Sequence, residues 1–206
     1  FAHLAPCDVA MEVGTHSRWV SNLLMSFGHT VVIANARKLR MIYESDHKDD
    51  RSDAKMLVTI LQFKRELLYP IKHRGDAAQD ALAVLRARDL LVRTRTKLVN
   101  HIRGVCKSGG ARMRSGSAEA FHHRELDELP DNRRAALSPL MQVLSSLADQ
   151  ISLYDAMIAK LSKEKFPETE TLSQPSGVGP ITALAFAATV EDPKRFPTGR
   201  NVASYF

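Results

Sequence analysis

Apolar residues recur at two different spacings along this chain, and the pattern changes near residue 70. Before that point, residues 7–13 and 31–34 are typical of short strands, and the stretch between them has helical spacing. We expect that helix to be capped by Thr15 and ended by Gly28. Its apolar face is expected to contain Trp19, Val20, Leu23, Leu24 and Phe27. This order of elements predicts an α/β layer with parallel strand pairing.

A further helix is expected after the acidic stretch at residues 48–53 and to end near Arg65. It follows a basic segment at residues 37–40. Its apolar side chains lie at helical spacing and are Met56, Leu57, Ile60 and Leu61. The first 72 residues therefore read as one α/β domain that ends with this helix.

The chain beyond Pro70 has the pattern of long helices. Residues 77–107 contain no Pro, and no Gly before Gly104, so a helix of this length is expected. Apolar residues recur in it at every seventh position, at Val84, Leu91, Leu98 and Val105.

A second long helix is expected over residues 132–165, where apolar positions alternate in steps of three and four. They are Leu137, Leu140, Leu144, Leu147, Ile151, Tyr154, Ile158 and Leu161. This spacing is typical of a coiled-coil seam. The seam can close on the first long helix as an antiparallel hairpin, on a second copy of the chain, or on both. Pro139 predicts that the helix starts near Ser138 or is kinked there.

The remaining segments complete a three-part organisation. Residues 108–131 are rich in Gly, Ser and Arg and are interpreted as a mobile connection. Gly177-Val-Gly179 resembles the turn of a helix-hairpin-helix, at the start of a third region. We therefore expect domains at residues 1–72, 73–166 and 167–206. The fold class is α/β plus α.

Composition narrows the function classes. The 206 residues carry a formal net charge of +6, which favours a polyanionic partner. The two cysteines, Cys7 and Cys106, form no CxxC pair, so neither a disulfide framework nor a structural zinc site is expected. No apolar run reaches membrane-spanning length, so no membrane partner is expected, and the cysteine usage indicates a reducing, cytoplasmic compartment. Both ends of the chain look cut from something longer.

Three carboxylates are candidates for metal chemistry. Asp50 and Asp53 are three residues apart at a helix start, so both can point at one spot, while Glu12 ends the first strand. Oxygen ligands of this kind suit Mg²⁺ or Mn²⁺ and phosphodiester chemistry. The alternative is that the acidic residues only cap the helix and complement its dipole. Asp49 is expected to face elsewhere on the helix.

Between Arg86 and Arg114, over most of the first long helix and the segment after it, many cations are opposed by the single acid Asp89. The candidate nucleic-acid-binding residues on this helix are Arg86, Arg88, Arg93, Arg95, Lys97, Arg103 and Lys107. With few aromatic residues nearby, the contacts are expected to be to phosphates. The alternative is a structural helix whose arginines pair with acidic residues elsewhere. Gly177 and Gly179 are candidates for phosphate contact through free amides, or form a plain helix-to-helix turn.

Several motifs, taken in order, resemble the DEDD insertion-sequence transposases, which include the Piv-type invertases and the bridge-RNA-guided recombinases. They are residues 9–14 with Trp19, the pattern Lys48-x-Asp50-x-x-Asp53, the basic motifs between residues 85 and 103, and residues 175–180 with 192–196. The resemblance covers essentially the whole chain. The ordered combination is more specific than any one motif.

This resemblance implies a RuvC-like, ribonuclease-H-type fold with a magnesium-binding Asp-Glu-Asp-Asp tetrad, in which Glu12, Asp50 and Asp53 are the last three members. It implies metal-dependent cutting and rejoining of donor and target DNA, a structured guide RNA in some members, and homo-oligomers through the coiled coil. It also implies a bacterial-type, nucleoid-associated protein. The first Asp and a downstream nucleophilic Ser lie outside this chain, which is therefore expected to be inactive alone. The alternatives are a RuvC-type structure-specific nuclease and a non-catalytic nucleic-acid-binding coiled-coil protein.

Overall fold

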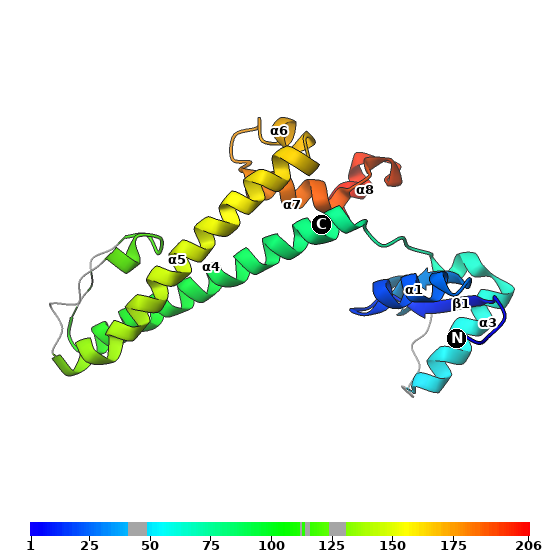
Figure 1. Ribbon diagram of the computed structural model, residues 1–206, viewed down its shortest axis with the longest axis horizontal. Helices are drawn as coiled ribbons and strands as arrows, with labels where there is room; N and C mark the ends of the chain where they lie inside the picture. The colour runs from blue at the N-terminus through cyan, green and yellow to red at the C-terminus, as the bar shows by residue number, and fades with distance from the viewer. Residues whose placement is uncertain (41–48, 112, 114–115, 124–130) are drawn as a thin grey trace. The chain divides into compact units, whose positions relative to one another are not determined.

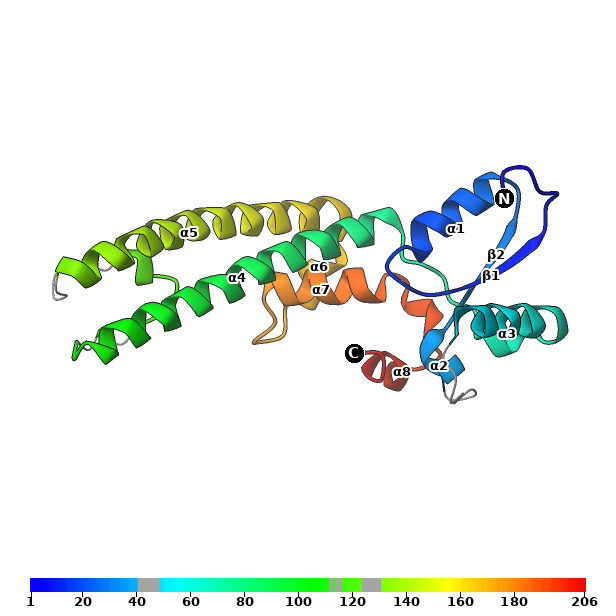
Figure 2. The same ribbon diagram turned by 90° about the horizontal axis from the view of Figure 1, so that it is seen from below.

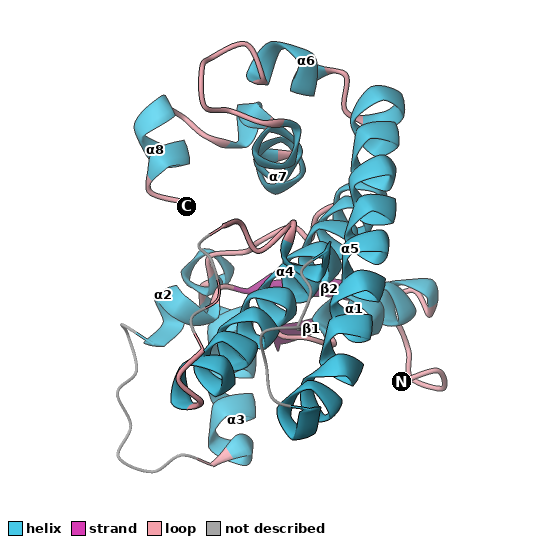
Figure 3. Ribbon diagram, turned by 90° about the vertical axis from the view of Figure 1, so that its left-hand side faces the viewer, coloured by secondary structure: helices cyan, strands magenta, loops and turns pink. Residues whose placement is uncertain are grey.

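The computed structural model describes residues 1–40, 49–111, 113, 116–123 and 131–206. The described chain is mostly helical, with one small sheet (Figure 3). It divides into two compact units, Phe1–His73 and Arg74–Phe206. The finer division expected within residues 73–206 stays a prediction. Within the described residues, no helix is both long and apolar enough to span a membrane.

The first unit is built on a two-stranded parallel sheet, as predicted from the order of apolar runs (Figure 1). Strand β1 (Asp8–Glu12) pairs with β2 (Thr30–Ala34), so that Glu12 lies opposite Ala34. Helix α1 (Ser17–Ser26) connects them. The chain leaves α1 through Gly28, whose φ of +88° is strained for residues with a side chain.

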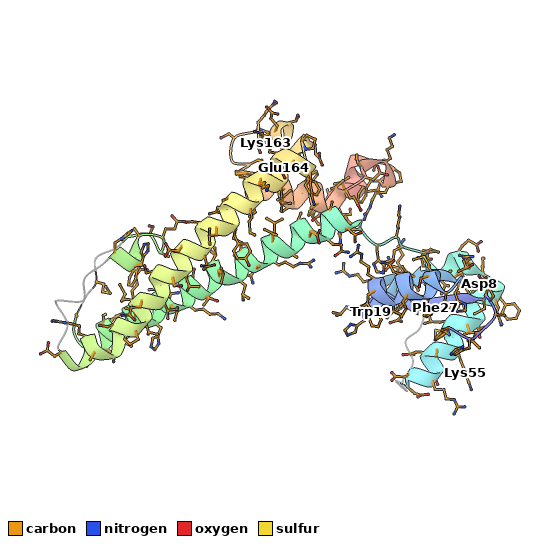
Figure 4. All side chains as sticks on the ribbon, in the orientation of Figure 1. Asp8, Trp19, Phe27, Lys55, Lys163 and Glu164 are labelled. Atoms are coloured by element: carbon orange, nitrogen blue, oxygen red, sulfur yellow. The ribbon has the colours of Figure 1, made fainter. Side chains whose placement is uncertain are left out.

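One expectation about α1 was wrong and another was only partly right. The N-cap is His16, without a side-chain cap hydrogen bond, and not Thr15. The helix places Ser17, Ser21 and Leu24 in the buried position. Of the expected apolar face, Leu24 is buried, but Trp19 is 59% exposed and Phe27, which directly follows α1, is 40% exposed; both are labelled in Figure 4. Apolar spacing alone cannot say which face of a helix meets the sheet, because that depends on the neighbouring elements.

A small core joins the sheet to the helices that follow it. Helix α3 (Asp50–Phe63) contributes Met56, Leu57, Ile60 and Leu61, the residues expected from their spacing. Between β2 and α3 lies α2 (Ala36–Arg40), and after α3 comes the 3₁₀ helix η1 (Arg65–Leu68). The chain after η1 returns to the sheet, where the Ile71 amide donates to the Ile33 carbonyl at 2.9 Å.

The second unit is organised around two long helices that lie side by side (Figures 1 and 2). They are α4 (Asp76–Ser108) and α5 (Asp131–Lys165), in agreement with the predicted ranges. The start of α4 shares a core with the end of α5, where Leu82 and Ile158 meet. The end of α4 shares another with the start of α5, where Ile102 and Leu137 meet. The pair is therefore antiparallel, one of the three closures left open by the sequence.

The apolar positions predicted on α5 form its buried face. Leu137, Leu144, Ile151 and Ile158 are at most 4% exposed. On α4, by contrast, the seven-residue series is only half-buried, and the buried positions beside it include Leu85, Val99 and Cys106. The expected start near Ser138 was wrong, because α5 begins at Asp131 and continues through Pro139.

Shorter elements pack against one end of the α4–α5 pair. Helix α7 (Pro180–Val190) contributes Leu184, Ala187 and Ala188 to the same core as α4 and α5. The other elements are α6 (Glu168–Leu172), η3 (Pro193–Arg195) and α8 (Gly199–Ala203). The predicted connection at residues 108–131 lies partly outside the described residues. Its described part contains η2 (Phe121–His123), whose Phe121 is fully buried in the second core.

Candidate active site and nucleic-acid interface

Glu12 is the last residue of β1 and lies at the carboxyl end of the sheet, where open α/β sheets bind ligands. Its side chain is exposed. The strand pairing continues one residue further, since the Val13 amide donates to the Ala34 carbonyl at 3.2 Å. The backbone is therefore hydrogen-bonded to β2 both before and after Glu12 along the chain, which fixes the position from which its carboxylate extends.

Asp49 is the residue that caps α3. Its carboxylate accepts hydrogen bonds from the Arg51 amide at 3.2 Å and from the Ser52 amide at 3.1 Å, and the Ser52 hydroxyl donates to it at 2.8 Å. The Ser52 hydroxyl, followed by the two amides, lowers the pKa of Asp49 below its ordinary value. Asp49 was expected to lie on the helix and face away from Asp50, and the structure instead makes it the N-cap residue before the helix. The spacing of Asp49 and Ser52 was the sequence signal for this cap.

Because Asp49 caps the helix, Asp50 and Asp53 in the first turn of α3 are not needed as capping residues. Both are exposed, and neither side chain forms a hydrogen bond or ion pair with the described residues. Two carboxylates at this spacing lie on one helix face and repel each other unless a cation joins them. Their chemistry fits a hard divalent cation.

Glu12 is not gathered with these two carboxylates into a finished site. Among the described residues, no group of three or more His, Cys, Asp or Glu side chains is placed to hold a metal ion. Helix α3 does contact β1, so both carboxylate positions belong to elements that pack together. Lys48, which belongs to the same motif, lies outside the described residues.

A hydrogen-bonded turn directly after Glu12 ties β1 to the end of the first unit. The buried Ser17 hydroxyl donates to the Gly14 carbonyl at 2.8 Å and lies 3.2 Å from Nε2 of His73. Because the hydroxyl proton is used on Gly14, the imidazole N–H is the donor to Ser17. Burial, and next the charge of Arg18, lower the pKa of His73 below 6.5.

This linkage predicts an acid-sensitive first unit. A histidine with a depressed folded pKa contributes stability above its unfolded pKa of about 6.5, and that stability is lost as pH falls through the folded value. We expect the denaturation midpoint of the first unit to fall between pH 7.5 and 5.5, and His73→Gln to flatten this dependence. Trp19, the one tryptophan, reports on this unit by fluorescence. The exposed His3, changed to Gln, is the control that should keep the wild-type slope; an unchanged slope in His73→Gln would contradict the assignment.

The cations predicted on α4 separate into two groups. Three have structural partners: Arg88 pairs with Asp155 at 2.5 Å, Arg103 donates to the Gly116 carbonyl at 2.8 Å, and Arg95 lies 3.7 Å from Glu119. Arg95 is only 8% exposed, and its Nε has no hydrogen-bond partner within the described chain. These three agree with the alternative of a structural helix, and the buried guanidinium of Arg95 is not presented to a ligand.

The other group forms one exposed face of α4, which we call the basic stripe. Its members are Arg86, Arg93, Lys97 and Lys107. At 3.6 residues per turn these positions fall within roughly a quarter of the helix circumference. Only Arg93 has a partner among the described residues, in an exposed ion pair with Asp89 at 2.8 Å. Exposed pairs of this kind are weak, so all four cations are accessible to an anion.

Arg95→Met is a test of the buried member. A buried charge with an incomplete set of partners is costly, so an unbranched apolar side chain is expected to raise the free energy of unfolding by about 1 kcal/mol. Nucleic-acid affinity is expected to stay within about twofold of wild type, because the guanidinium is not exposed. Urea denaturation followed by circular dichroism measures the first quantity and fluorescence anisotropy the second. A tenfold loss of nucleic-acid affinity in Arg95→Met would contradict this assignment and show that Arg95 contacts the nucleic acid.

The Gly177–Gly179 turn leads directly into α7. Gly177 has a φ of +90°, which requires glycine, and Gly179 is the N-cap of α7 without a side-chain cap. A Cβ added at either glycine meets no atom within 4 Å, so the space beside both α-carbons is open. This is compatible both with phosphate contact and with a plain turn between helices.

Comparison with protein families gives two matches in chain order. A model of DEDD transposases of the IS110 type, described as "Transposase", matches residues 2–108. A model described as "Transposase IS116/IS110/IS902 family" matches residues 169–206. The first match contains the carboxylates and α4, and the second contains the Gly177–Gly179 turn and α7.

Individual relatives agree with the family models. A "Probable family 20 transposase" of Pseudomonas aeruginosa is 29% identical over 100% of this chain and 62% of its own length. A "Putative transposase y4pF/y4sB" of Sinorhizobium fredii is 30% identical over 100% of this chain and 53% of its own length. The "Transposase for insertion sequence element IS1111A" of Coxiella burnetii is 29% identical over 97% of this chain and 55% of its own length. The chain thus spans somewhat more than half the length of these relatives.

Proposed function

Because the chain belongs to the IS110 family of DEDD transposases, we propose that its first unit binds the divalent metal with which a transposase cuts and rejoins the DNA of a mobile element. The observation that carries this proposal is that different acidic residues cap α3 and remain unpaired at its start. Asp49 accepts hydrogen bonds from the Arg51 and Ser52 amides at the helix terminus, so the carboxylates of Asp50 and Asp53 are left without a hydrogen bond or ion pair among the described residues.

Glu12, Asp50 and Asp53 are the residues of this chain that would hold Mg²⁺ or Mn²⁺. When bound, such an ion activates an attacking oxygen and stabilises a leaving oxygen in phosphodiester chemistry. The chain's own contribution is to hold carboxylates on two packed elements, β1 and α3. The Ser17–Gly14 turn and the β1–β2 pairing restrict the backbone on either side of Glu12.

The basic stripe of α4 would hold the nucleic-acid backbone. Its four cations are exposed and the face has no aromatic residue, which supports contact with phosphates instead of stacking on bases. The partner is donor or target DNA, or a structured guide RNA. Comparing the binding of duplex DNA with that of a structured RNA distinguishes these partners. Gly177 and Gly179 would add amide contacts to phosphate at the start of α7.

The finer fold assignments belong to the same proposal. The parallel pairing of β1 and β2 with helices around it supports a partial RuvC-like domain, and the antiparallel α4–α5 pair supports a coiled-coil hairpin. The helices α6 and α7 with the glycine turn between them support a helix-hairpin-helix. On α5, Val143, Leu153 and Met157 remain 46–58% exposed, which supports a homo-oligomer formed through that helix.

A thermal-unfolding measurement with the metal alone tests the carboxylate site. At Mn²⁺ concentrations about ten times the dissociation constant, the first unit should gain about 1.4 kcal/mol, which is a rise of several degrees. Trp19 fluorescence reports on this unit. Asp50→Asn and Asp53→Asn are each expected to remove most of the rise, because each deletes a charged ligand.

The matched control is Asp149→Asn, which removes an exposed carboxylate from α5 and should keep the full rise. An unchanged unfolding temperature of the wild-type chain with both Mn²⁺ and Mg²⁺ would contradict the metal proposal. If Asp149→Asn loses as much of the metal-induced rise in unfolding temperature as the Asp50 and Asp53 variants, the ion binds by general charge attraction.

A further inference from the structure

A shallow hollow of about 490 Å³ lies in the first unit beside the carboxyl end of β2. Its lining brings together three short segments of the chain: the start of α2, the start of η1, and the residues that follow η1. The polar residues among them are Asn35, Lys38, Arg65, Glu66 and Tyr69. Two cations face one acid, so the hollow is net positive.

Backbone hydrogen bonds hold the walls of this hollow in place. The Asn35 amide donates to the Leu68 carbonyl at 3.0 Å, which ties the end of β2 to η1. The Asn35 side chain accepts from the Arg37 amide at 3.2 Å and from the Lys38 amide at 3.4 Å, which fixes the first turn of α2. The positions of Lys38 and Arg65 are therefore set by the sheet and not by a free loop.

Tyr69 has an unusual backbone conformation in this hollow. Its φ of 46° and ψ of 62° are left-handed, a region that residues with a side chain rarely adopt. The Lys38 ammonium lies 4.6 Å from the centroid of the Tyr69 ring, so the ring holds this cation by a cation–π contact. Strained residues of this kind concentrate at functional sites. Here the strained conformation presents an aromatic face to a lysine.

The hollow opens at the same sheet edge as Glu12. Glu12 pairs in register with Ala34, the last residue of β2, and Asn35 directly follows that strand. Neighbouring parallel strands end at one edge, so the cations of the hollow and the Glu12 carboxylate belong to adjacent strand ends. An anionic polymer lying along this edge would meet the two features in succession.

We propose that this hollow binds a backbone phosphate of the DNA strand that runs along the carboxylate edge. Lys38 and Arg65 supply the charge, and Tyr69 acts as a positioning residue that holds the Lys38 ammonium. All three side chains are exposed, which suits a polymer lying across the surface. The inference rests on the proposed function and adds to it a phosphate contact outside the carboxylates and the basic stripe.

The test compares two double variants with the same loss of charge. Lys38→Gln with Arg65→Gln removes both cations of the hollow, and Arg37→Gln with Lys64→Gln removes the exposed neighbours of each, which do not line it. Binding of a fluorescent single-stranded DNA is measured by anisotropy over a range of salt concentrations. We expect the first variant to bind about tenfold more weakly and to lose about 0.7 from the salt slope, the value for one phosphate contact on a single strand.

Tyr69 is tested by a conservative pair. Tyr69→Phe keeps the ring and is expected to bind like wild type, whereas Tyr69→Ala should weaken binding several-fold, like Lys38→Gln alone. Equal effects of the two tyrosine variants would overturn the positioning role. Competition with thymidine monophosphate separates a strand phosphate from a free nucleotide: displacement at micromolar concentrations would overturn the assignment to a DNA strand, and none would support it.

The two proposals fail in different ways. If the wild-type chain binds DNA and the two double variants lose affinity equally, the phosphate site is overturned and the proposed function stands. If the wild-type chain binds no DNA at any salt concentration, nucleic-acid binding itself fails, and the phosphate site fails with it. A loss of DNA affinity in the Lys38/Arg65 variant but not in the Arg37/Lys64 variant supports both the phosphate site and nucleic-acid binding.

Discussion

Leu144→Ala is expected to lower the free energy of unfolding of the second unit by about 3 kcal/mol. Leu144 is 1% exposed and lies in the core that joins the end of α4 to the start of α5. Its truncation removes buried apolar surface and leaves a cavity between two long helices that relax little. Urea denaturation followed by circular dichroism at 222 nm measures the loss, because most of the helical signal arises from this unit.

The matched control is on the same helix. Leu153 is 58% exposed, so Leu153→Ala should change the free energy of unfolding by less than about 0.5 kcal/mol. The pair of variants also separates two uses of α5. A large, concentration-dependent loss in Leu153→Ala would place that residue in an interface between copies of the chain, and a small loss in Leu144→Ala would contradict the antiparallel packing.

Replacing Arg86, Lys97 and Lys107 together by Gln is expected to weaken nucleic-acid binding by about 100-fold at moderate salt. These three members of the basic stripe are exposed and have no partner among the described residues, so their charge is fully available to phosphates. Each lost contact to a duplex should reduce the salt slope by about 0.9. Fluorescence anisotropy with duplex DNA and with a structured RNA, at matched salt, measures both quantities.

Three exposed lysines at the end of α5 provide the control: Lys160, Lys163 and Lys165. Figure 4 shows Lys163 at that end of the helix. Changing them to Gln removes the same charge from the same unit and should reduce affinity by less than about threefold. An equal loss in both triple variants would indicate a general charge effect. A loss confined to RNA would assign the basic stripe to a guide, and a loss confined to duplex DNA would assign it to donor or target DNA.

Local patterns in the sequence were sufficient to predict the main helices and strands. Apolar residues in steps of three and four predict one face of α5, and Leu137, Leu144, Ile151 and Ile158 form that face because a helix places such positions in line whatever it packs against. The parallel β1–β2 pair followed from the order of two apolar runs around a helix. The family resemblance followed from motifs that recur in a fixed order along the chain.

The tertiary structure decided which side chains are free to act. The sequence by itself determined that acidic residues start α3 and that cations line α4, but charge counts cannot show partners that come from distant segments. Asp155 and Glu119 lie beside Arg88 and Arg95 only because α4 packs with α5 and the connecting segment. Lys38 meets Tyr69 only because the chain after η1 returns to β2. A hydrogen bond or ion pair depends on distances of a few ångströms, and packing sets those distances.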